Sequence, residues 1–140
     1  MFRKDGRWYA GDEPVTHEGL ARFFTRYLRR KPSGDGYEIW VDERFHADVD
    51  VEDTPYVVTE LLATADGQLQ VRLNDDSVEP LDPRGLSVAA DGAVVCTVKA
   101  GQDKARFLRS AQADLASYLE EHDEHWCLHI GGRHYPIRHE

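Results

Sequence analysis

The stretch that most constrains the fold is residues 16–51, because a helical pattern there runs straight into a β-hairpin pattern. Apolar residues recur at intervals of three and four, which places them along one side of a helix. Thr16 is a suitable N-cap and Pro32 cannot continue a helix, so we expect the helix to span residues 16–30. The stripe predicted to face the core consists of Leu20, Phe23, Phe24, Tyr27 and Leu28.

Two strand-like segments follow this helix. Residues 37–41 and 45–51 flank a turn at Asp42-Glu43. In the second segment apolar residues, beginning with Phe45, alternate with polar ones. A period of two with one apolar face is typical of a half-buried strand in an antiparallel sheet.

Glycine-containing pairs predict further hairpins. Asp-Gly occurs at 5–6, 66–67 and 91–92, and Gly-Gly at 131–132. These pairs favour two-residue type I′ turns, which need a positive φ at both positions. The predicted hairpins cover residues 2–9, 56–73, 86–98 and 126–137. In the last hairpin we expect Trp126, Leu128, Ile130, Tyr135 and Ile137 to face the core, with Cys127, His129 and His134 on the other side.

A second helix is predicted over residues 104–121. The tripeptide Ala-Arg-Phe occurs at 21–23 and again at 105–107, so each predicted helix contains one copy. The order of helix followed by antiparallel strands therefore occurs twice, which favours an α+β fold. We expect two related helix-plus-antiparallel-sheet motifs, residues 1–80 and 81–140, packed together as one compact unit.

Charge is distributed unevenly along the chain. The formal net charge of −9 argues against a nucleic-acid partner, because phosphate binding needs a surplus of Lys and Arg. Residues 1–31 nevertheless carry eight basic and four acidic side chains, a net charge of +4, which leaves −13 for residues 32–140. Arg22, Arg26 and Arg29 lie opposite the apolar stripe. They form a candidate site for a small anionic ligand or an acidic protein partner, and the alternative is a solvated helix face.

Histidines gather near the C-terminus. In the predicted register His129 lies opposite His134, so both imidazoles are candidate metal ligands, with Cys127 or His125 as a third. No spacing in this segment matches a structural zinc pattern, and we expect no cofactor. His129, His134 and Cys127 therefore support only an alternative function, that of a metal-dependent small-molecule enzyme.

Several classes of protein are disfavoured. The sequence has no Gly-x-Ser-x-Gly, no phosphate-binding loop and no His-Glu-x-x-His. It has no apolar run near the ~20 residues that cross a bilayer, and no secretory signal, so we expect no membrane partner. Cys96 and Cys127 lie in strand-like runs, as expected for reduced thiols of a cytoplasmic protein. The predicted hairpins leave sheet edges that a homodimer would cover.

An ordered series of short segments resembles a bacterial family called domain of unknown function 1285 (DUF1285). No single segment is specific, but their order and spacing cover almost the whole chain. Three features differ from the family pattern: N-terminal residues are missing, residues 41–44 replace a usual T-P-V-E-K turn, and the Ala-Arg-Phe segment at 105–107 is one residue longer. The segments are Gly6-Arg7-Trp8-Tyr9, Arg22-Phe23-Phe24, Leu28-Arg29-Arg30, Gly36-Tyr37, residues 51–56 and residues 132–137.

The resemblance implies an α+β fold built from two similar helix-plus-sheet motifs and no established catalytic activity. It also implies a role in signalling, which has been suggested for the family. Together with the residue patterns, it leads us to expect a non-enzymatic bacterial protein of the cytoplasm that binds a ligand or a protein and acts in regulation or signalling.

Overall fold

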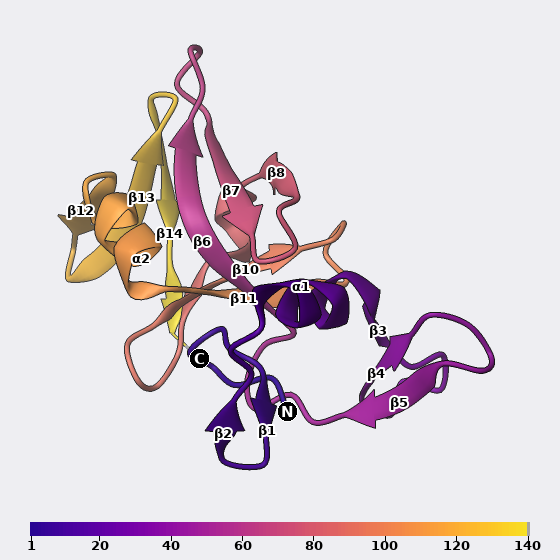
Figure 1. Ribbon diagram of the computed structural model, residues 1–140. Coiled ribbons are helices and arrows are strands. Elements are labelled where there is room, and N and C mark those ends of the chain that lie inside the picture. The colour runs from indigo at the N-terminus through magenta and orange to yellow at the C-terminus, as the bar shows by residue number, and fades with distance from the viewer. Residues whose placement is uncertain (140) are drawn as a thin grey trace. The chain divides into compact units, whose positions relative to one another are not determined.

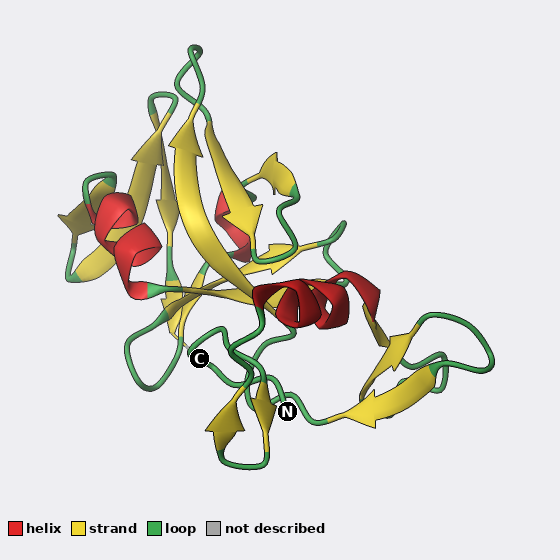
Figure 2. Ribbon diagram, viewed as in Figure 1, coloured by secondary structure: helices red, strands yellow, loops and turns green. Residues whose placement is uncertain are grey.

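The computed structural model describes residues 1–139 of a mostly-β α+β fold. Across these residues the chain forms two α-helices and four sheets (Figure 2). It divides into two compact units: the first is Met1–Pro55, and the second begins at Tyr56. The boundary expected from the sequence, at 80/81, lies within the second unit. Neither helix of the described residues is long and apolar enough to span a membrane.

The first unit contains one helix and two small sheets (Figure 1). Strands β1 and β2 form a two-stranded sheet, and β3, β4 and β5 form a three-stranded antiparallel sheet in that order. The predicted hairpin after the helix is therefore confirmed. The elements are β1 (Tyr9–Ala10), β2 (Glu13–Pro14), α1 (Glu18–Tyr27), β3 (Leu28–Arg30), β4 (Tyr37–Trp40) and β5 (His46–Val49).

Helix α1 is shorter than the sequence pattern predicted. Its N-cap is His17 rather than Thr16, and the His17 Nδ1 accepts a hydrogen bond from the Leu20 amide at 3.0 Å. The helix ends at Tyr27 because Leu28 adopts an extended backbone and pairs with Ile39 of β4. Residues 28–30 thus exchange helical hydrogen bonds for sheet hydrogen bonds, which the local 3.6-residue period could not indicate.

The buried side of α1 is also different from the predicted stripe. Leu20 and Phe23 are 43% and 42% exposed, whereas Thr25 and Leu28 are buried. At ~100° per residue, this buried side lies about a quarter of a turn from the centre of the predicted stripe. The predicted core position of Leu20 and Phe23 is therefore wrong.

An aromatic cluster explains why α1 buries a different side from the one predicted. The Trp8 ring lies 5.1 Å from the Phe2 ring and 5.3 Å from the Phe24 ring. The Phe2 amide donates to the Asp50 carbonyl at 2.9 Å, which fixes the N-terminal segment beside the end of β5. Because Trp8 is 4% exposed, it draws the side of α1 that carries Phe24 and Thr25 into the core of the first unit.

Phe45 is another predicted core residue that the structure exposes. It is 70% exposed and precedes β5, in which His46, Ala47 and Asp48 are exposed as well. Phe45 belongs to the preceding turn, where its amide donates to Asp42 Oδ1 at 2.9 Å.

The second unit contains a seven-stranded sheet, a three-stranded sheet and α2 (Figure 1). The large sheet has the order β15-β9-β10-β11-β6-β7-β8, with parallel pairing only between β11 and β6 and between β15 and β9 across the described residues. The predicted hairpins over 56–73, 86–98 and 126–137 are confirmed. The elements are β6 (Tyr56–Ala63), β7 (Leu69–Leu73), β8 (Val78–Pro80), η1 (Pro83–Gly85), β9 (Ser87–Val88), β10 (Val94–Val98), β11 (Asp103–Phe107), α2 (Arg109–Ala116), β12 (Leu119–His122), β13 (His125–Ile130), β14 (Arg133–Pro136) and β15 (Arg138–His139).

The predicted second helix is wrong at both ends. Residues 103–107 form β11, inserted between β10 and β6, where Ala105 and Phe107 are buried. Residues 119–122 form β12. The second copy of Ala-Arg-Phe is therefore strand rather than helix, so this part of the predicted repeat is incorrect. Both helices nevertheless lead into a three-stranded antiparallel sheet, β3-β4-β5 after α1 and β12-β13-β14 after α2.

The Asp-Gly turns differ in type from the prediction. At 66–67 and 91–92 the glycine alone has a positive φ, and its amide donates to the carbonyl three residues earlier. Each turn is therefore a three-residue loop. Asp91 Oδ1 accepts from the Ala93 amide at 3.2 Å, a side-chain hydrogen bond to the backbone two residues later. The Gly131-Gly132 turn has the predicted form, with φ of 58° and 73°.

The core of the second unit lies between the two sheets and α2. Ala111 and Leu115 of α2 and Leu128 of β13 belong to the same buried cluster as the valines of the large sheet. Trp126, which the sequence placed on the core face of the last hairpin, is 46% exposed instead. The core face of that hairpin is formed by Leu128, Ile130 and Ile137.

Candidate functional site

Two of the three candidate arginines lie on the exposed side of α1. Arg22 and Arg26 are four residues apart, so their side chains are neighbours on the helix surface. The Arg26 guanidinium lies 5.6 Å from the Tyr27 ring centroid. Within the described residues neither arginine has a carboxylate partner, so both guanidiniums are available to an anionic group.

Arg29 has a different environment, because it lies on β3 rather than on the helix. Its Nε donates to Glu38 Oε2 at 2.8 Å, and its guanidinium lies 4.3 Å from the Trp40 ring centroid. Glu38 is 7% exposed, so its carboxylate is largely removed from water, whereas the Arg29 side chain is 40% exposed. The three arginines do not share one helix face, and Arg29 stabilises the β3–β4 pair.

Other basic side chains of residues 1–31 are also paired within the first unit. Lys31 Nζ lies 2.8 Å from Asp48 Oδ2, and that hydrogen bond raises the pKa of Lys31. Arg3 forms an ion pair with Asp12 at 3.4 Å. Part of the positive charge seen in the sequence is thus neutralised locally by Asp12, Glu38 and Asp48.

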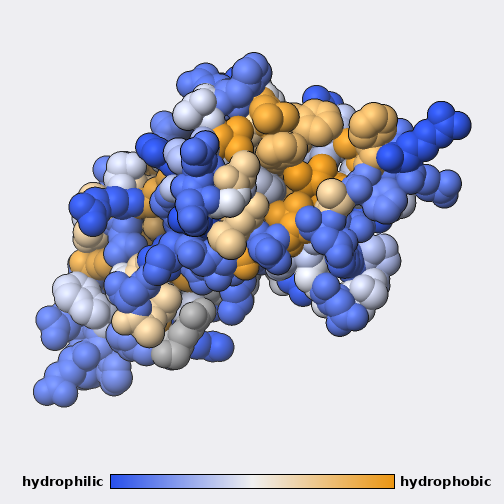
Figure 3. All heavy atoms as spheres, turned by 60° about the horizontal axis from the view of Figure 1, so that its bottom comes forward, coloured by the Kyte–Doolittle hydropathy of each residue, from blue (hydrophilic) through white to orange (hydrophobic). Residues whose placement is uncertain are grey.

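Exposed apolar side chains lie beside these arginines. Phe23 lies between Arg26 and Leu20 in angular position around α1. The Phe23 ring contacts the Tyr27 ring at 4.9 Å, so part of its surface is covered, yet 42% remains exposed. Figure 3 shows hydrophobic side chains, in orange, that reach the surface among hydrophilic ones. We call Leu20, Arg22, Phe23 and Arg26 the α1 surface.

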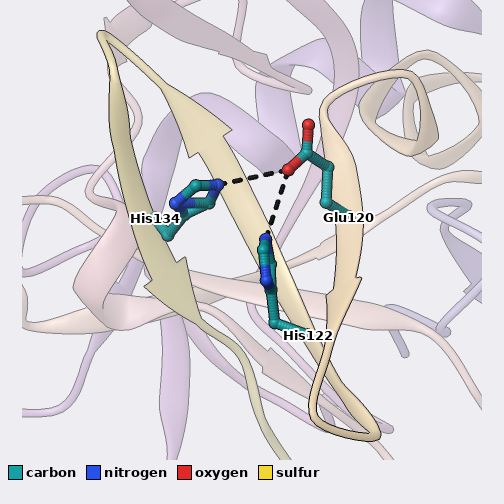
Figure 4. A group of neighbouring side chains, drawn as sticks. All are labelled: Glu120, His122 and His134. Carbon is teal, nitrogen blue, oxygen red and sulfur yellow. Dashed lines mark hydrogen bonds and ion pairs between the residues drawn. The ribbon is translucent and has the colours of Figure 1, made fainter.

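The C-terminal sheet brings histidines and a carboxylate together. His129 of β13 lies opposite His134 of β14, as predicted, and their rings stack with centroids 4.3 Å apart. Glu120 of β12 joins them: its Oε1 is 3.0 Å from His129 Nδ1, and its Oε2 is 3.1 Å from His134 Nε2. His122 Nε2 lies 3.4 Å from the same Oε2 (Figure 4).

Hydrogen bonding dominates the electrostatics of this cluster. The hydrogen bonds from His129 and His122 hold the pKa of Glu120 below its ordinary value of 4.5. The carboxylate is therefore ionised at neutral pH and stays an acceptor for all three imidazoles. Because these side chains are exposed or half-buried, the cluster is open to solutes.

Sequence reasoning missed Glu120 because it assigned residues 104–121 to a helix. On a helix Glu120 would have no fixed relation to β13, whereas on β12 it pairs directly with Cys127. Residues 119–122 read Leu-Glu-Glu-His and show no alternation of apolar and polar residues, so the sequence carried no strand signal at Glu120.

Neither cysteine belongs to the group formed by Glu120, His122 and His134. Cys127 shares a face of the sheet with His129 by register, but it is buried, and the three residues with ligand atoms in close reach of one another are Glu120, His122 and His134. Cys96 is fully buried, and burial raises the pKa of its thiol to about 12. A thiol with that pKa is a poor nucleophile at neutral pH.

Comparison with solved structures identifies the fold. A DUF1285 family protein from Silicibacter pomeroyi DSS-3 matches with a TM-score of 0.70 at 19% sequence identity, covering 98% of this chain and 78% of that one. A DUF1285 family protein from Shewanella baltica OS155 matches with a TM-score of 0.63 at 16% identity, covering 83% of this chain and 88% of that one. This chain has the DUF1285 fold.

The structural match confirms the resemblance read from the sequence segments. No family model matches the sequence, and no curated protein matches it. The similarity therefore lies in the backbone arrangement more than in residue identity. At 16% and 19% sequence identity, a shared fold does not indicate a shared activity. Function therefore has to be argued from the side chains of this chain.

Proposed function

We propose that this chain is a non-enzymatic binding module whose partner is a protein segment carrying both acidic and apolar side chains. The observation that supports this is the composition of the α1 surface, where Leu20 and Phe23 are each more than 40% exposed beside Arg22 and Arg26. The module would act in regulation or signalling, by docking rather than by catalysis.

The apolar residues decide which class of partner fits. A phosphorylated metabolite would neutralise the two guanidiniums but leave Phe23 and Leu20 in water. A peptide can place carboxylates against the arginines and an apolar side chain against Phe23. Burying a Phe or Leu side chain fully contributes ~1.5–3 kcal/mol, and arginine forms bidentate pairs with carboxylates. A protein segment therefore uses the whole α1 surface.

We also propose that the two helix-plus-sheet segments are related building blocks. Support comes from their shared order, in which α1 and α2 are each followed by a three-stranded antiparallel sheet with strands in sequence order. The proposal is tested by superposing Cα atoms of residues 18–49 on those of 109–136, which should align strand by strand in the same order. Alignment of the helices alone would contradict it.

The docking proposal is tested by fluorescence anisotropy with labelled synthetic peptides and the full chain. One short peptide alternates Glu with Leu and Phe, and a second replaces every apolar residue with Ser at the same charge. We expect binding of the first and much weaker binding of the second. A parallel thermal-shift screen with inorganic phosphate, nucleotides and phosphorylated metabolites measures binding of small anions.

Matched variants locate the binding surface. Arg22→Glu combined with Arg26→Glu, and Phe23→Ser alone, should each reduce peptide affinity at least about tenfold, since a lost charge-assisted hydrogen bond or apolar contact contributes ~1.5–3 kcal/mol. Arg109→Glu is the control, because Arg109 is exposed on α2. Equal binding of the two peptides, equal loss in the control, or stabilisation by phosphate alone would contradict the proposal. A concentration-dependent dimer abolished by the double variant would identify a second copy of the chain as the occupant instead.

A further inference from the structure

Three candidate ligand atoms converge on one side of the β12-β13-β14 sheet. Glu120 and His122 come from β12 and His134 comes from β14. One carboxylate oxygen of Glu120 and one ring nitrogen from each histidine lie within 4.8 Å of one another. Figure 4 shows both imidazoles directed at the same oxygen of Glu120. This arrangement belongs to the second unit and uses no residue of the α1 surface.

We propose that Glu120, His122 and His134 bind one divalent transition-metal ion of the Zn²⁺ type, with a fourth position open to water or to an external donor. Two ligand atoms about 2.1 Å from a tetrahedral ion lie ~3.4 Å apart. The His122 Nε2 and His134 Nε2 atoms lie 3.4 Å and 3.1 Å from Glu120 Oε2. Small rotations of the imidazoles, which lie on a solvent-exposed face, therefore admit the ion.

The donor set selects the class of metal. Two imidazole nitrogens and one carboxylate oxygen suit Zn²⁺, Co²⁺, Ni²⁺ and Cu²⁺. Ca²⁺ and Mg²⁺ prefer sites built from oxygen alone. Each imidazole would bind through Nε2 with its proton on Nδ1. A neutral imidazole that donates from Nε2 to Glu120 in the absence of metal would lose that proton to solvent and take one up on Nδ1 when the ion binds.

His129 supports this site without being one of its ligands. Its Nδ1 lies 3.0 Å from Glu120 Oε1, the carboxylate oxygen that does not face His122 and His134. Its ring also stacks on the ring of His134. Partners of this kind fix the orientation of a ligating carboxylate or imidazole. His129 is therefore a positioning residue.

The bound ion would link the two outer strands of the sheet. Glu120 and His122 lie on one side of the central strand β13, and His134 lies on the other. A metal bridge between β12 and β14 would hold the sheet in one curvature and stabilise the folded second unit by its binding free energy. The open fourth position could accept a carboxylate from another molecule.

The test uses the full chain without a histidine tag. After incubation with Zn²⁺ and exhaustive dialysis, elemental analysis should find one ion per chain. Titration with Co²⁺ should produce the visible absorption of a tetrahedral complex, and the melting temperature should rise with Zn²⁺ concentration. His122→Ala, His134→Ala and Glu120→Gln should each remove stoichiometric binding. His46→Ala should retain it, since His46 is an exposed histidine of the first unit.

His129→Ala separates positioning from ligation. Its Zn²⁺ affinity should fall about 10- to 100-fold while the stoichiometry and the Co²⁺ spectrum are kept. Circular dichroism of each metal-free variant verifies that it folds. An adventitious ion only, meaning substoichiometric binding that His46→Ala lowers as much as His134→Ala, would overturn the proposal. So would full binding by the Glu120→Gln variant or no rise in melting temperature with any of the four metals.

Discussion

The indole Nε1–H of Trp8 donates a hydrogen bond to Thr25 Oγ1 at 2.9 Å, and both side chains are buried. This contact joins the N-terminal segment to the last turn of α1. It also fixes which side of the helix enters the core of the first unit, because Thr25 must face Trp8. Phe23 and Leu20 are exposed as a consequence, so the hydrogen bond determines the composition of the α1 surface.

Thr25→Val should destabilise the first unit by ~1–3 kcal/mol, because the substitution keeps the shape of the side chain but leaves the buried indole N–H without an acceptor. Thr25→Ser keeps the hydroxyl and should cost less. The free energy of unfolding is measured by urea denaturation followed by tryptophan fluorescence, to which Trp8 and Trp40 of the first unit contribute. Equal stability of the Val and wild-type chains would show that the hydrogen bond does not hold α1.

Arg29→Met should also destabilise the first unit, by ~1–3 kcal/mol, since Glu38 is 7% exposed and would lose its partner. Arg22→Met is the matched control and should change the free energy of unfolding by no more than about 0.5 kcal/mol. Adding Glu38→Leu to Arg29→Met should restore stability, because no unpaired carboxylate is then buried. If Arg22→Met cost as much as Arg29→Met, the assignment of Arg29 to folding and of Arg22 to binding would be incorrect.

The turn between β12 and β13 should respond to glycine. Asp123 and Glu124 adopt φ of 51° and 67°, a conformation that costs an L-residue ~1–2 kcal/mol. Asp123→Asn together with Glu124→Gly should therefore raise the free energy of unfolding by about 1–2 kcal/mol. Gly132→Ala is the converse control in the other two-residue turn. A Cβ at Gly132 would meet nothing within 4 Å. Any loss of stability in the Gly132→Ala variant therefore measures the cost of a positive φ and not a steric clash. No gain from the double variant would show that the positive φ values at residues 123 and 124 cost the fold no stability.

Stability at acid pH should depend on the pair formed by Asp75 and Lys99. Burial by itself raises the pKa of Asp75, but hydrogen bonds from Lys99 and Ser77 outweigh it and hold the pKa below the ordinary value of 3.8. A carboxyl with a lowered pKa in the folded state stabilises the fold above pH 3.8. That contribution is lost as pH falls through the folded-state pKa.

Lys99→Met should shift the acid-induced loss of stability to higher pH, because the variant lacks the hydrogen bond and the charge of Lys99 that lower the pKa of Asp75. Lys99→Arg keeps the charge and should resemble the wild type. The measurement is the melting temperature between pH 2 and pH 7 for the three chains. Identical pH profiles for Lys99→Met and wild type would show that the 2.7 Å contact between Lys99 Nζ and Asp75 Oδ2 does not stabilise the fold.

The hairpins could be predicted from the sequence because their information is local. Residues 56–73 and 126–137 carry turn residues flanked by strand formers, and the register that places His129 opposite His134 follows from the length of the turn alone. The loop length of the Asp-Gly turns could not be predicted from the dipeptide. The aspartate side chain accepts from the backbone two residues later, and that favours a three-residue loop over the two-residue one.

The helix–strand assignments failed where a distant segment supplies hydrogen bonds. Residues 103–107 have good helix formers, but in the structure they insert between β10 and β6, which offer backbone partners on both sides. Residues 28–30 likewise pair with β4. In both segments the local period fits a helix, and long-range pairing overrides it.

By itself the sequence determined the α+β class, most of the hairpins, the uneven charge and the pairing of His129 with His134. These properties depend on residues that are close in the chain. Only the tertiary structure decided that Arg29 pairs with Glu38, that Phe23 stays exposed, and that Glu120 and His122 meet His134. Each of these depends on which strand lies beside which, because the free energy of sheet pairing and burial comes from residues far apart in the sequence.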